Sequence, residues 1–189
     1  MSKILVIIDM QNDFVTGALR NEDAIKIVPN VVEKVRKAKE DGDIVLFTRD
    51  THFANYLETQ EGKNLPVEHC IKNTWGWEII DELKGFVDDK GNSNRHPLPP
   101  FDKKTFGSLT LGKYIASLTN GANTFDKVEI IGICTDICVI SNATIIKASC
   151  PEVLIEVDAS CCAGVTPQAH KNALAAMESI QIKVTNKED

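Results

Sequence analysis

The sequence lacks an excess of positive charge, and it lacks any long apolar run. Lys and Arg number 21 against 27 Asp and Glu, which gives a formal net charge of -6 at pH 7. Such a chain offers no basic face to a phosphate backbone, so we expect no nucleic-acid partner. A membrane-spanning helix needs about 20 consecutive apolar residues, and no run approaches that length, so we expect no membrane partner.

A secretion signal is also lacking. The apolar stretch 4–8 ends in Asp9 without a small-residue cleavage site, so it is interpreted as a first strand. The 189 residues, 43% of them hydrophobic, are enough for one domain with a full core. The six cysteines are then not needed as disulfides. We predict reduced thiols, a cytoplasmic location and a single domain over residues 1–189.

Strand-like and helix-like patterns alternate along the chain. Apolar runs predict strands at 3–9, 44–48, 128–133, 153–157 and 180–184, with a weakly marked strand at 85–88. Helical spacing is found at 23–40, 75–83, 109–118, 137–148 and 167–179. The alternation predicts an α/β fold: a doubly wound, mostly parallel sheet with helices on both faces, a Rossmann-like three-layer sandwich. Two long polar loops, 50–74 and 89–107, are expected to carry function.

One cysteine stands in the first turn of the helix that follows strand 128–133. Cys138 there meets the positive end of the helix dipole and free backbone N–H groups, which favour thiolate and can hold an oxyanion. The alternative is a small apolar residue packed inside the helix. Cys134 lies four positions earlier, so a C-x-x-x-C dithiol is a further alternative. We predict that Cys138 is a nucleophile.

Other reactive side chains follow the other predicted strands. Asp9 closes the first strand, and Asp50 follows the second. Lys103 and Lys104 follow the third, weakly marked strand. Ligands of a doubly wound sheet bind beyond the carboxyl ends of its strands, so these groups are expected to share one crevice with Cys138. A carboxylate balanced between burial and a nearby lysine can pass a proton, which makes Asp9 the candidate base.

A metal site is predicted in the loop after the second strand. Asp50 and His52, together with His69, form a set of two histidines and one carboxylate. Imidazole and carboxylate ligands with open positions suit Zn, Mn or Fe(II). We expect a divalent metal here, with Zn the first choice.

Four motifs together resemble the isochorismatase-like cysteine hydrolases and, within them, the nicotinamidases. They are VIIDMQNDF at 6–14, TRDTH at 48–52 with LPVEHC at 65–70, DKKTFGSL at 102–109, and GICTDICV at 132–139. The resemblance covers almost the whole chain. In the third motif the family places its lysine three residues before an aromatic, and this spacing selects Lys103 over Lys104.

The resemblance implies a catalytic triad of Asp9, Lys103 and Cys138. It implies an oxyanion hole formed by the backbone N–H groups of Cys134 and Cys138, and a cis peptide bond directly before Cys134. It assigns metal ligation to Asp50, His52 and His69, with Glu61 at a fourth position that some members use. The substrate pocket it implies is lined by Phe14, Phe106, Leu65 and Trp75. Residues 107–109 depart from the Ser-Ala-Phe of many nicotinamidases, so the pocket wall is expected to differ.

The expected activity is that of a cysteine amidohydrolase, a nicotinamidase in NAD salvage that converts nicotinamide to nicotinate and ammonia through a thioester. The expected partner is a small-molecule amide, and relatives imply a homo-oligomer. The main alternative is a related cysteine amidase acting on another small amide or on a carbamoyl or ureido substrate. A non-catalytic binding module that retains the metal, and a thiol-redox protein using Cys134 and Cys138, are further alternatives.

Overall fold

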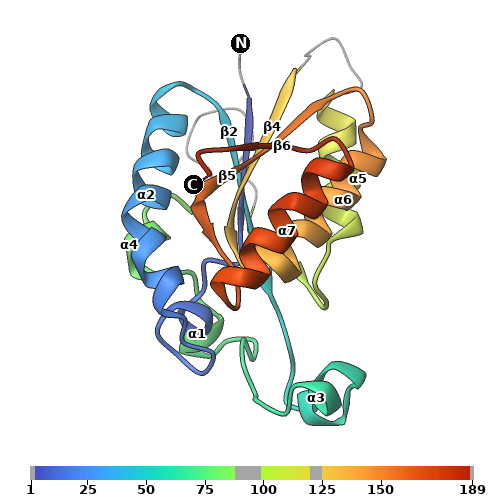
Figure 1. Cartoon of the computed structure of the whole chain (residues 1–189). Coiled ribbons are helices and arrows are strands. Elements are labelled where there is room, and N and C mark those ends of the chain that lie inside the picture. Colours follow the sequence, from blue (N-terminus) through green and yellow to red (C-terminus); the bar gives the residue numbers. More distant parts are fainter. Residues whose placement is uncertain (1–2, 88–98, 120–124, 188–189) are drawn as a thin grey trace.

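The computed structural model describes residues 3–87, 99–119 and 125–187 as one parallel sheet between two layers of helices (Figure 1). The six strands are β1 (Ile4–Ile8), β2 (Ile44–Asp50), β3 (Phe101–Lys103), β4 (Lys127–Ile133), β5 (Leu154–Ala163) and β6 (Lys183–Thr185). The helices are α1 (Asn12–Val15), α2 (Glu22–Glu40), α3 (Gln60–Asn64), α4 (Asp81–Lys84), α5 (Leu109–Thr119), α6 (Ile140–Ser149) and α7 (Pro167–Ser179). Short 3-10 turns at Tyr56–Glu58 and Trp75–Trp77 and a π-helical turn at Thr135–Val139 complete the described elements. The predicted fold class is confirmed.

Strand β1 is apolar throughout because both of its faces are covered. Every residue of β1 is buried, and alternate side chains enter different cores. Leu5 and Ile7 pack with α2 and α4, whereas Ile4, Val6 and Ile8 pack with α5, α6 and α7. A strand covered on both faces favours apolar side chains at every position, which is the pattern of a parallel sheet between two helical layers.

Helix α2 forms where the sequence supplies a cap and one apolar face. The Asn21 side chain accepts hydrogen bonds from the N–H groups of Asp23 and Ala24 and satisfies the first free donors of the helix. Val31, Val35 and Ala38 recur at helical spacing, and all are buried against the sheet. This helix covers one face of the sheet beside the cleft described below.

The strand order is β3-β2-β1-β4-β5-β6, and every pairing is parallel. The chain therefore winds outward from β1 in one direction and from β4 in the other, which makes the carboxyl ends of β1 and β4 the switch point where ligands bind in such sheets. Gly132 brings these two ends together. Its φ is +117°, and a Cβ atom there would lie 2.1 Å from the Ile8 carbonyl oxygen, so only glycine fits.

The prediction of a strand at 85–88 is wrong for the residues that the structure describes. Phe86 and Val87 donate backbone hydrogen bonds to Leu83 and Lys84 in turns that end α4, and their apolar side chains pack on the core beside α2. Residues 88–98 lie outside the described part. The third strand is instead β3, which pairs with β2 from Thr48 to Asp50. A strand of three residues carries too little alternation to be found from sequence.

Other boundaries also differ from prediction. Strand β5 runs to Ala163, the last strand begins at Lys183, and the helix predicted at 75–83 is a 3-10 turn followed by α4. All six cysteines are free thiols. Over the described ranges, the structure contains no helix with the length and apolar character that crossing a membrane requires.

A charged cluster joins α2 to the sheet and makes a testable contribution to stability. Lys34 Nζ pairs with Glu129 2.7 Å away and with Asp158, and Lys3 pairs with the other oxygen of Glu129 at 2.5 Å. Burial would raise the pKa values of Glu129 and Asp158, but Lys3 and Lys34 outweigh it at Glu129, and Lys34 with hydrogen bonds from Ser160 and Asn186 outweighs it at Asp158, so both pKa values are lowered. Lys34→Met should therefore reduce the free energy of unfolding at pH 7 by about 2 kcal/mol, since the buried Asp158 loses its lysine partner and the buried Glu129 keeps only Lys3.

The pH dependence of that loss gives its check. A carboxylate whose pKa is lowered by folding contributes stability above its unfolded pKa and loses it as the pH falls through the folded value. The difference between Lys34→Met and the parent, measured by urea unfolding, should thus shrink as the pH falls below the ordinary pKa values of Asp and Glu, 3.8 and 4.5. A difference of the same size at pH 3 and pH 7 would contradict the electrostatic account.

Candidate active site

Three residues distant in sequence meet at the carboxyl ends of the central strands. Asp9 follows β1, Lys103 ends β3, and Cys138 lies in the π-helical turn after β4. Lys103 Nζ is 2.6 Å from Asp9 Oδ2 and 3.4 Å from Cys138 Sγ. All three side chains are buried. The structure thus brings together the base, the ammonium and the thiol that the sequence predicted would converge.

Asp9 is held so that one carboxylate oxygen faces its partners. Its backbone has a φ of +48°, in the left-handed region that non-glycine residues rarely adopt. The Thr48 hydroxyl donates to Asp9 Oδ1 at 2.6 Å and accepts from the Asp9 N–H at 3.1 Å. Oδ2 contacts the Lys103 ammonium but accepts no well-directed hydrogen bond. Asp9 Oδ2 is therefore the oxygen placed to accept a proton.

Burial and neighbouring charges shift the pKa values of Asp9 and Lys103. Burial and the nearby Asp50 carboxylate raise the pKa of Asp9, and Lys103 counteracts them only in part. Burial lowers the pKa of Lys103, but Asp9, Cys138 and Asp50 outweigh it, so the pKa lies above its usual value. Lys103 therefore carries a positive charge between two acidic groups.

The pKa of the Cys138 thiol is set by effects that act in opposite directions. Burial raises the pKa of the Cys138 thiol well above its usual value, and the attraction of Lys103 is too small to reverse this, while Asp9 raises it further. Lys103 favours the thiolate as expected, but in the free protein burial outweighs this attraction. Desolvation by the surrounding core, which sequence does not reveal, is the largest effect. A nucleophilic Cys138 needs a base to remove its proton, and Asp9 is the group beside it.

The turn that carries Cys138 has an unusual backbone. The Ile133–Cys134 peptide bond is cis, as the resemblance implied. The N–H groups of Ile137 and Val139 both donate to the Cys134 carbonyl, at 3.1 and 3.0 Å, and close a π-helical turn before α6 begins. Cys134 and Cys138 stand at the start and near the end of this turn, at the amino-terminal side of α6, where backbone N–H groups favour negative charge.

The four predicted metal ligands also converge. Donor atoms of Asp50, His52, Glu61 and His69 all lie within 4.8 Å of one another. Asp50 Oδ2 is 3.1 Å from His52 Nε2 and 3.6 Å from His69 Nε2, and Glu61 Oε1 is 3.4 Å from His52 Nε2. The Nδ1 atom of His69 lies 2.8 Å from the Val67 carbonyl oxygen. That contact fixes the ring and leaves Nε2 for a metal, as is typical of histidine ligands.

This donor set fits a divalent metal. Two bonds of about 2.1 Å bring a pair of zinc ligands no more than about 4.2 Å apart, close to the spacing observed. Asp50 Oδ1 is buried and accepts no well-directed hydrogen bond, and Lys103 Nζ lies 3.4 Å from it. Burial would raise the pKa of Asp50, but Lys103, His52 and His69 outweigh it and hold the pKa well below its usual range. Asp50 is therefore ionised, and it links the metal ligands to the triad.

A cavity of about 810 Å³ opens onto these groups. Cys134, Cys138, Asp50, Glu61 and His69 line it. Apolar side chains from several segments form much of the remaining wall, and the polar residues of 20–23 complete it: Phe14, Ala18, Leu19, Leu65, Phe106, Ile137 and Val165, with Arg20, Asn21, Glu22 and Asp23. Three of the four predicted pocket residues thus reach the cavity, and Trp75 does not.

The two tryptophans of the 3-10 turn explain the place of Trp75. The Trp77 indole donates to Thr51 Oγ1 at 2.8 Å and packs beneath the guanidinium of Arg49, so Trp77 occupies the inner side of the turn. Trp75 is 56% exposed on the outer side. Neither tryptophan lines the cavity, and the sequence Trp-Gly-Trp alone does not show which of the two packs inward.

Gln11 is a site residue that sequence reasoning missed. Its amide donates to the Asp50 carbonyl at 2.9 Å and accepts from the Asp50 N–H at 2.7 Å. The same side chain donates to the Trp77 carbonyl at 2.9 Å. These hydrogen bonds fix the end of β2 against the end of β1 and so position Asp50. A buried amide within the first motif was the signal that could have identified it.

Asn142 is a second buried amide that sequence reasoning missed. Its amide donates to the Cys138 carbonyl at 2.8 Å and to the Phe106 carbonyl at 3.0 Å, and it accepts from the Ser108 N–H at 3.0 Å. Asn142 thereby ties the turn that bears the thiol to the loop that forms one wall of the cavity.

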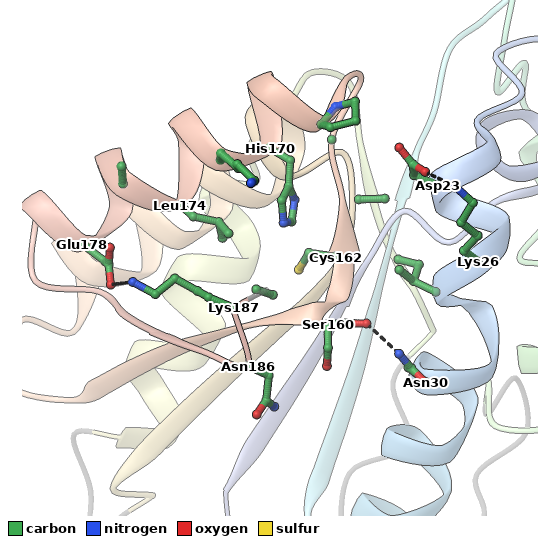
Figure 2. Close-up of a pocket in the computed structure, with 17 residues that line it drawn as sticks. Asp23, Lys26, Asn30, Ser160, Cys162, His170, Leu174, Glu178, Asn186 and Lys187 are labelled. Atoms are coloured by element: carbon green, nitrogen blue, oxygen red, sulfur yellow. Dashed lines mark hydrogen bonds and ion pairs between the residues drawn. The ribbon is translucent and has the colours of Figure 1, made fainter. Parts of the chain in front are cut away.

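A second cavity, of about 660 Å³, lies between α2, the end of β5 and α7 (Figure 2). Its polar groups largely bind one another: Lys26 pairs with Asp23, Lys187 pairs with Glu178, and the Asn30 amide donates to the Ser160 carbonyl. None of the predicted site residues lines it. The first cavity is therefore the candidate active site.

A family model described as the isochorismatase domain matches residues 3–189. The chain belongs to the isochorismatase family. The resemblance inferred from the four motifs is confirmed, and the protein is a hydrolase of this family with nicotinamidase relatives.

Two curated relatives of this isochorismatase-family hydrolase are informative. The nicotinamidase of Saccharomyces cerevisiae is 26% identical over 187 residues, which cover 78% of this chain and 81% of the relative. A probable inactive nicotinamidase of Arabidopsis thaliana is 29% identical over 192 residues, which cover 95% and 89%. The relatives thus include an enzyme and a protein described as inactive.

Solved structures give the same family likeness. The nicotinamidase/pyrazinamidase of Bacillus subtilis is 26% identical with a TM-score of 0.82, and the match covers 98% of this chain and 100% of that one. A pyrazinamidase of Pyrococcus horikoshii in complex with zinc is 27% identical with a TM-score of 0.75, covering 99% and 100%. The zinc in that relative and the four clustered donors here together indicate a divalent metal.

Proposed function

We propose that this protein hydrolyses nicotinamide to nicotinate and ammonia through a thioester on Cys138. The contact of Lys103 with both Asp9 and Cys138, beneath a cavity with apolar walls, is the observation that carries the proposal. The nicotinamidase relatives support the choice of substrate. Splitting amide hydrolysis into acylation and deacylation replaces one difficult step by two easier ones.

In acylation, Asp9 accepts the proton of the Cys138 thiol while the sulfur attacks the amide carbonyl carbon. Lys103 compensates the negative charge as it passes from carboxylate to sulfur. The backbone N–H groups of Cys134 and Cys138 hold the oxyanion of the tetrahedral intermediate, and each such donor contributes about 3 kcal/mol. Asp9 then returns the proton to the departing nitrogen, the carbon–nitrogen bond breaks, and ammonia leaves the thioester.

In deacylation, Asp9 takes a proton from a water molecule, and the resulting hydroxide attacks the thioester carbonyl. The carbon–sulfur bond breaks, the proton goes to the sulfur, and nicotinate is released. Asp9 therefore acts as base and acid in both halves of the reaction, which suits a carboxyl whose pKa is raised toward the working pH.

The remaining residues bind and orient the substrate. Phe14, Phe106 and Leu65 provide apolar surface for the ring. Asp50, His52, His69 and Glu61 would hold the metal, Zn first among Zn, Mn and Fe. When bound, the metal supplies a Lewis acid to which the pyridine nitrogen or a water can coordinate.

An ammonia-release assay over a panel of small amides tests the substrate. Nicotinamide is expected to exceed aliphatic, carbamoyl and ureido amides in kcat/KM. A higher value for a carbamoyl or ureido compound would support the rival amidase of the same architecture. Ammonia release from none of the panel would contradict the proposal and support a non-catalytic binding module.

The metal site gives a separate prediction. His52→Ala removes one of two imidazole ligands and should weaken zinc binding and raise KM for nicotinamide, each by about tenfold or more. Iodoacetamide labelling of Cys138 should change much less, because the thiol is activated by Asp9 and Lys103. Zinc affinity is measured by chelator competition and labelling by mass spectrometry. Equal losses of zinc affinity and labelling would contradict this division of roles.

We also propose that residues 1–189 form a single domain, that the protein is a homo-oligomer, and that it acts in NAD salvage in the cytoplasm. The family model, which spans residues 3–189, supports the first proposal. Light scattering from the purified protein measures the oligomeric state.

A further inference from the structure

A buried carboxylate next to the site has no part in the reaction just described. Asp13 lies in α1 and is 8% exposed. Its Oδ2 accepts the Cys70 N–H at 2.7 Å, and its Oδ1 accepts the Ala18 N–H at 3.1 Å. Charged oxygens that accept backbone N–H groups form strong hydrogen bonds, so this carboxylate fixes both segments of chain.

The bond to Cys70 connects Asp13 with both histidines of the metal site. The Cys70 N–H belongs to the peptide that joins His69 to Cys70, so Asp13 fixes the plane of that peptide. Cys70 has a φ of +46°, in the left-handed region, and its carbonyl accepts the His52 N–H at 3.0 Å. The backbone between the two imidazole ligands is thus held at one end by Asp13.

Two glycines leave the space that the Asp13 carboxylate occupies. A Cβ atom at Gly76 would lie 2.0 Å from Asp13 Oδ2, and one at Gly17 would lie 2.5 Å from Asp13 Oδ1. Neither separation is possible between real atoms, so the carboxylate needs glycine at both places. The segment after Gly17 contains Ala18 and Leu19, which line the cavity.

We propose that Asp13 is a positioning residue that sets the metal affinity of the site by fixing the His69–Cys70 peptide, without touching metal or substrate. This inference rests on the metal site of the proposed function. It does not depend on which amide is hydrolysed.

Zinc dissociation constants, measured by chelator competition on the folded full-length chain, test the proposal. Asp13→Asn should weaken zinc binding about tenfold or more, the range typical of groups that orient metal ligands. Gly76→Ala, which keeps the charge and takes the space of the carboxylate, should act in the same direction. Glu68→Gln is the matched control, because it removes an exposed carboxylate adjacent to His69, and it should change zinc affinity less than about twofold.

The outcomes separate positioning from general structural support. Cobalt(II) absorption provides a second readout, and a changed visible spectrum in Asp13→Asn is expected, since the geometry of the ligands shifts. Zinc affinity and spectrum equal to those of the parent in both variants would overturn the proposal, as would a lower unfolding midpoint of the metal-free variants with unchanged zinc affinity. A parent that binds no zinc overturns it together with the metal site. A parent that binds zinc and releases no ammonia from nicotinamide overturns only the substrate assignment.

Discussion

Cys138→Ala is expected to reduce ammonia release from nicotinamide at least about 10⁴-fold, to the background of the assay, because the sulfur that attacks the amide in the proposed mechanism is removed. Cys138 Sγ lies 3.4 Å from Lys103 Nζ and beside Asp9 at the base of the cavity. The loss is expected in kcat, and binding of nicotinate, followed by calorimetry, should persist.

The fold of this variant should remain intact. Replacing sulfur by hydrogen in a buried side chain costs about 1–2 kcal/mol, which a domain of this size tolerates. Cys150→Ala is the matched control, since Cys150 is equally buried at the end of α6 and away from the cavity. It should keep the parent rate. Ammonia release by Cys138→Ala at more than about a hundredth of the parent rate would rule out the covalent route.

Asp9→Asn is expected to lower kcat by about 10³-fold to 10⁴-fold, at the upper end of what one general acid–base group contributes. Burial raises the pKa of the Cys138 thiol, so the free protein holds a thiol that needs a base. Asparagine has nearly the shape of aspartate and can still bind Thr48, but it cannot accept the thiol proton. Steady-state kinetics at pH 7 measure the effect.

Two further measurements identify the cause of the Asp9→Asn effect. Iodoacetamide labelling of Cys138 should slow in parallel with kcat, because both reactions need the proton removed. Asp102→Asn provides the control: it makes the same change one residue before Lys103, at a side chain that pairs with Arg49 outside the cavity. It should alter kcat less than about twofold. Unchanged labelling in Asp9→Asn would show that another group takes the proton.

The parts of this protein that could be predicted from sequence are those where one physical requirement dominates. A strand covered on both faces, such as β1, is apolar throughout, and reactive residues that follow such strands are conspicuous, so Asp9 and Cys138 could be predicted. Strand β3 has three residues and its own burial pattern is mixed, so its hydrogen bonds with β2, not its composition, define it.

The remaining features depend on three-dimensional surroundings. The raised pKa of Cys138 follows from the core that encloses it, whereas the local sequence showed only the helix start and a lysine. Gln11 acts through the backbone of Asp50, 39 positions away, and Asp13 through that of Cys70, 57 positions away, and a sequence does not show which carbonyl or N–H a side chain will reach. Trp75 and Trp77 differ only in which side of one turn they occupy.

The most direct test of the central claim is mass spectrometry of the protein quenched in acid during turnover of nicotinamide. The account predicts a population heavier by one nicotinoyl group, attached to the peptide that contains Cys138, and no such species in Cys138→Ala. Ammonia release at the normal rate with no acylated protein, or with the acyl group on a different residue, would contradict it.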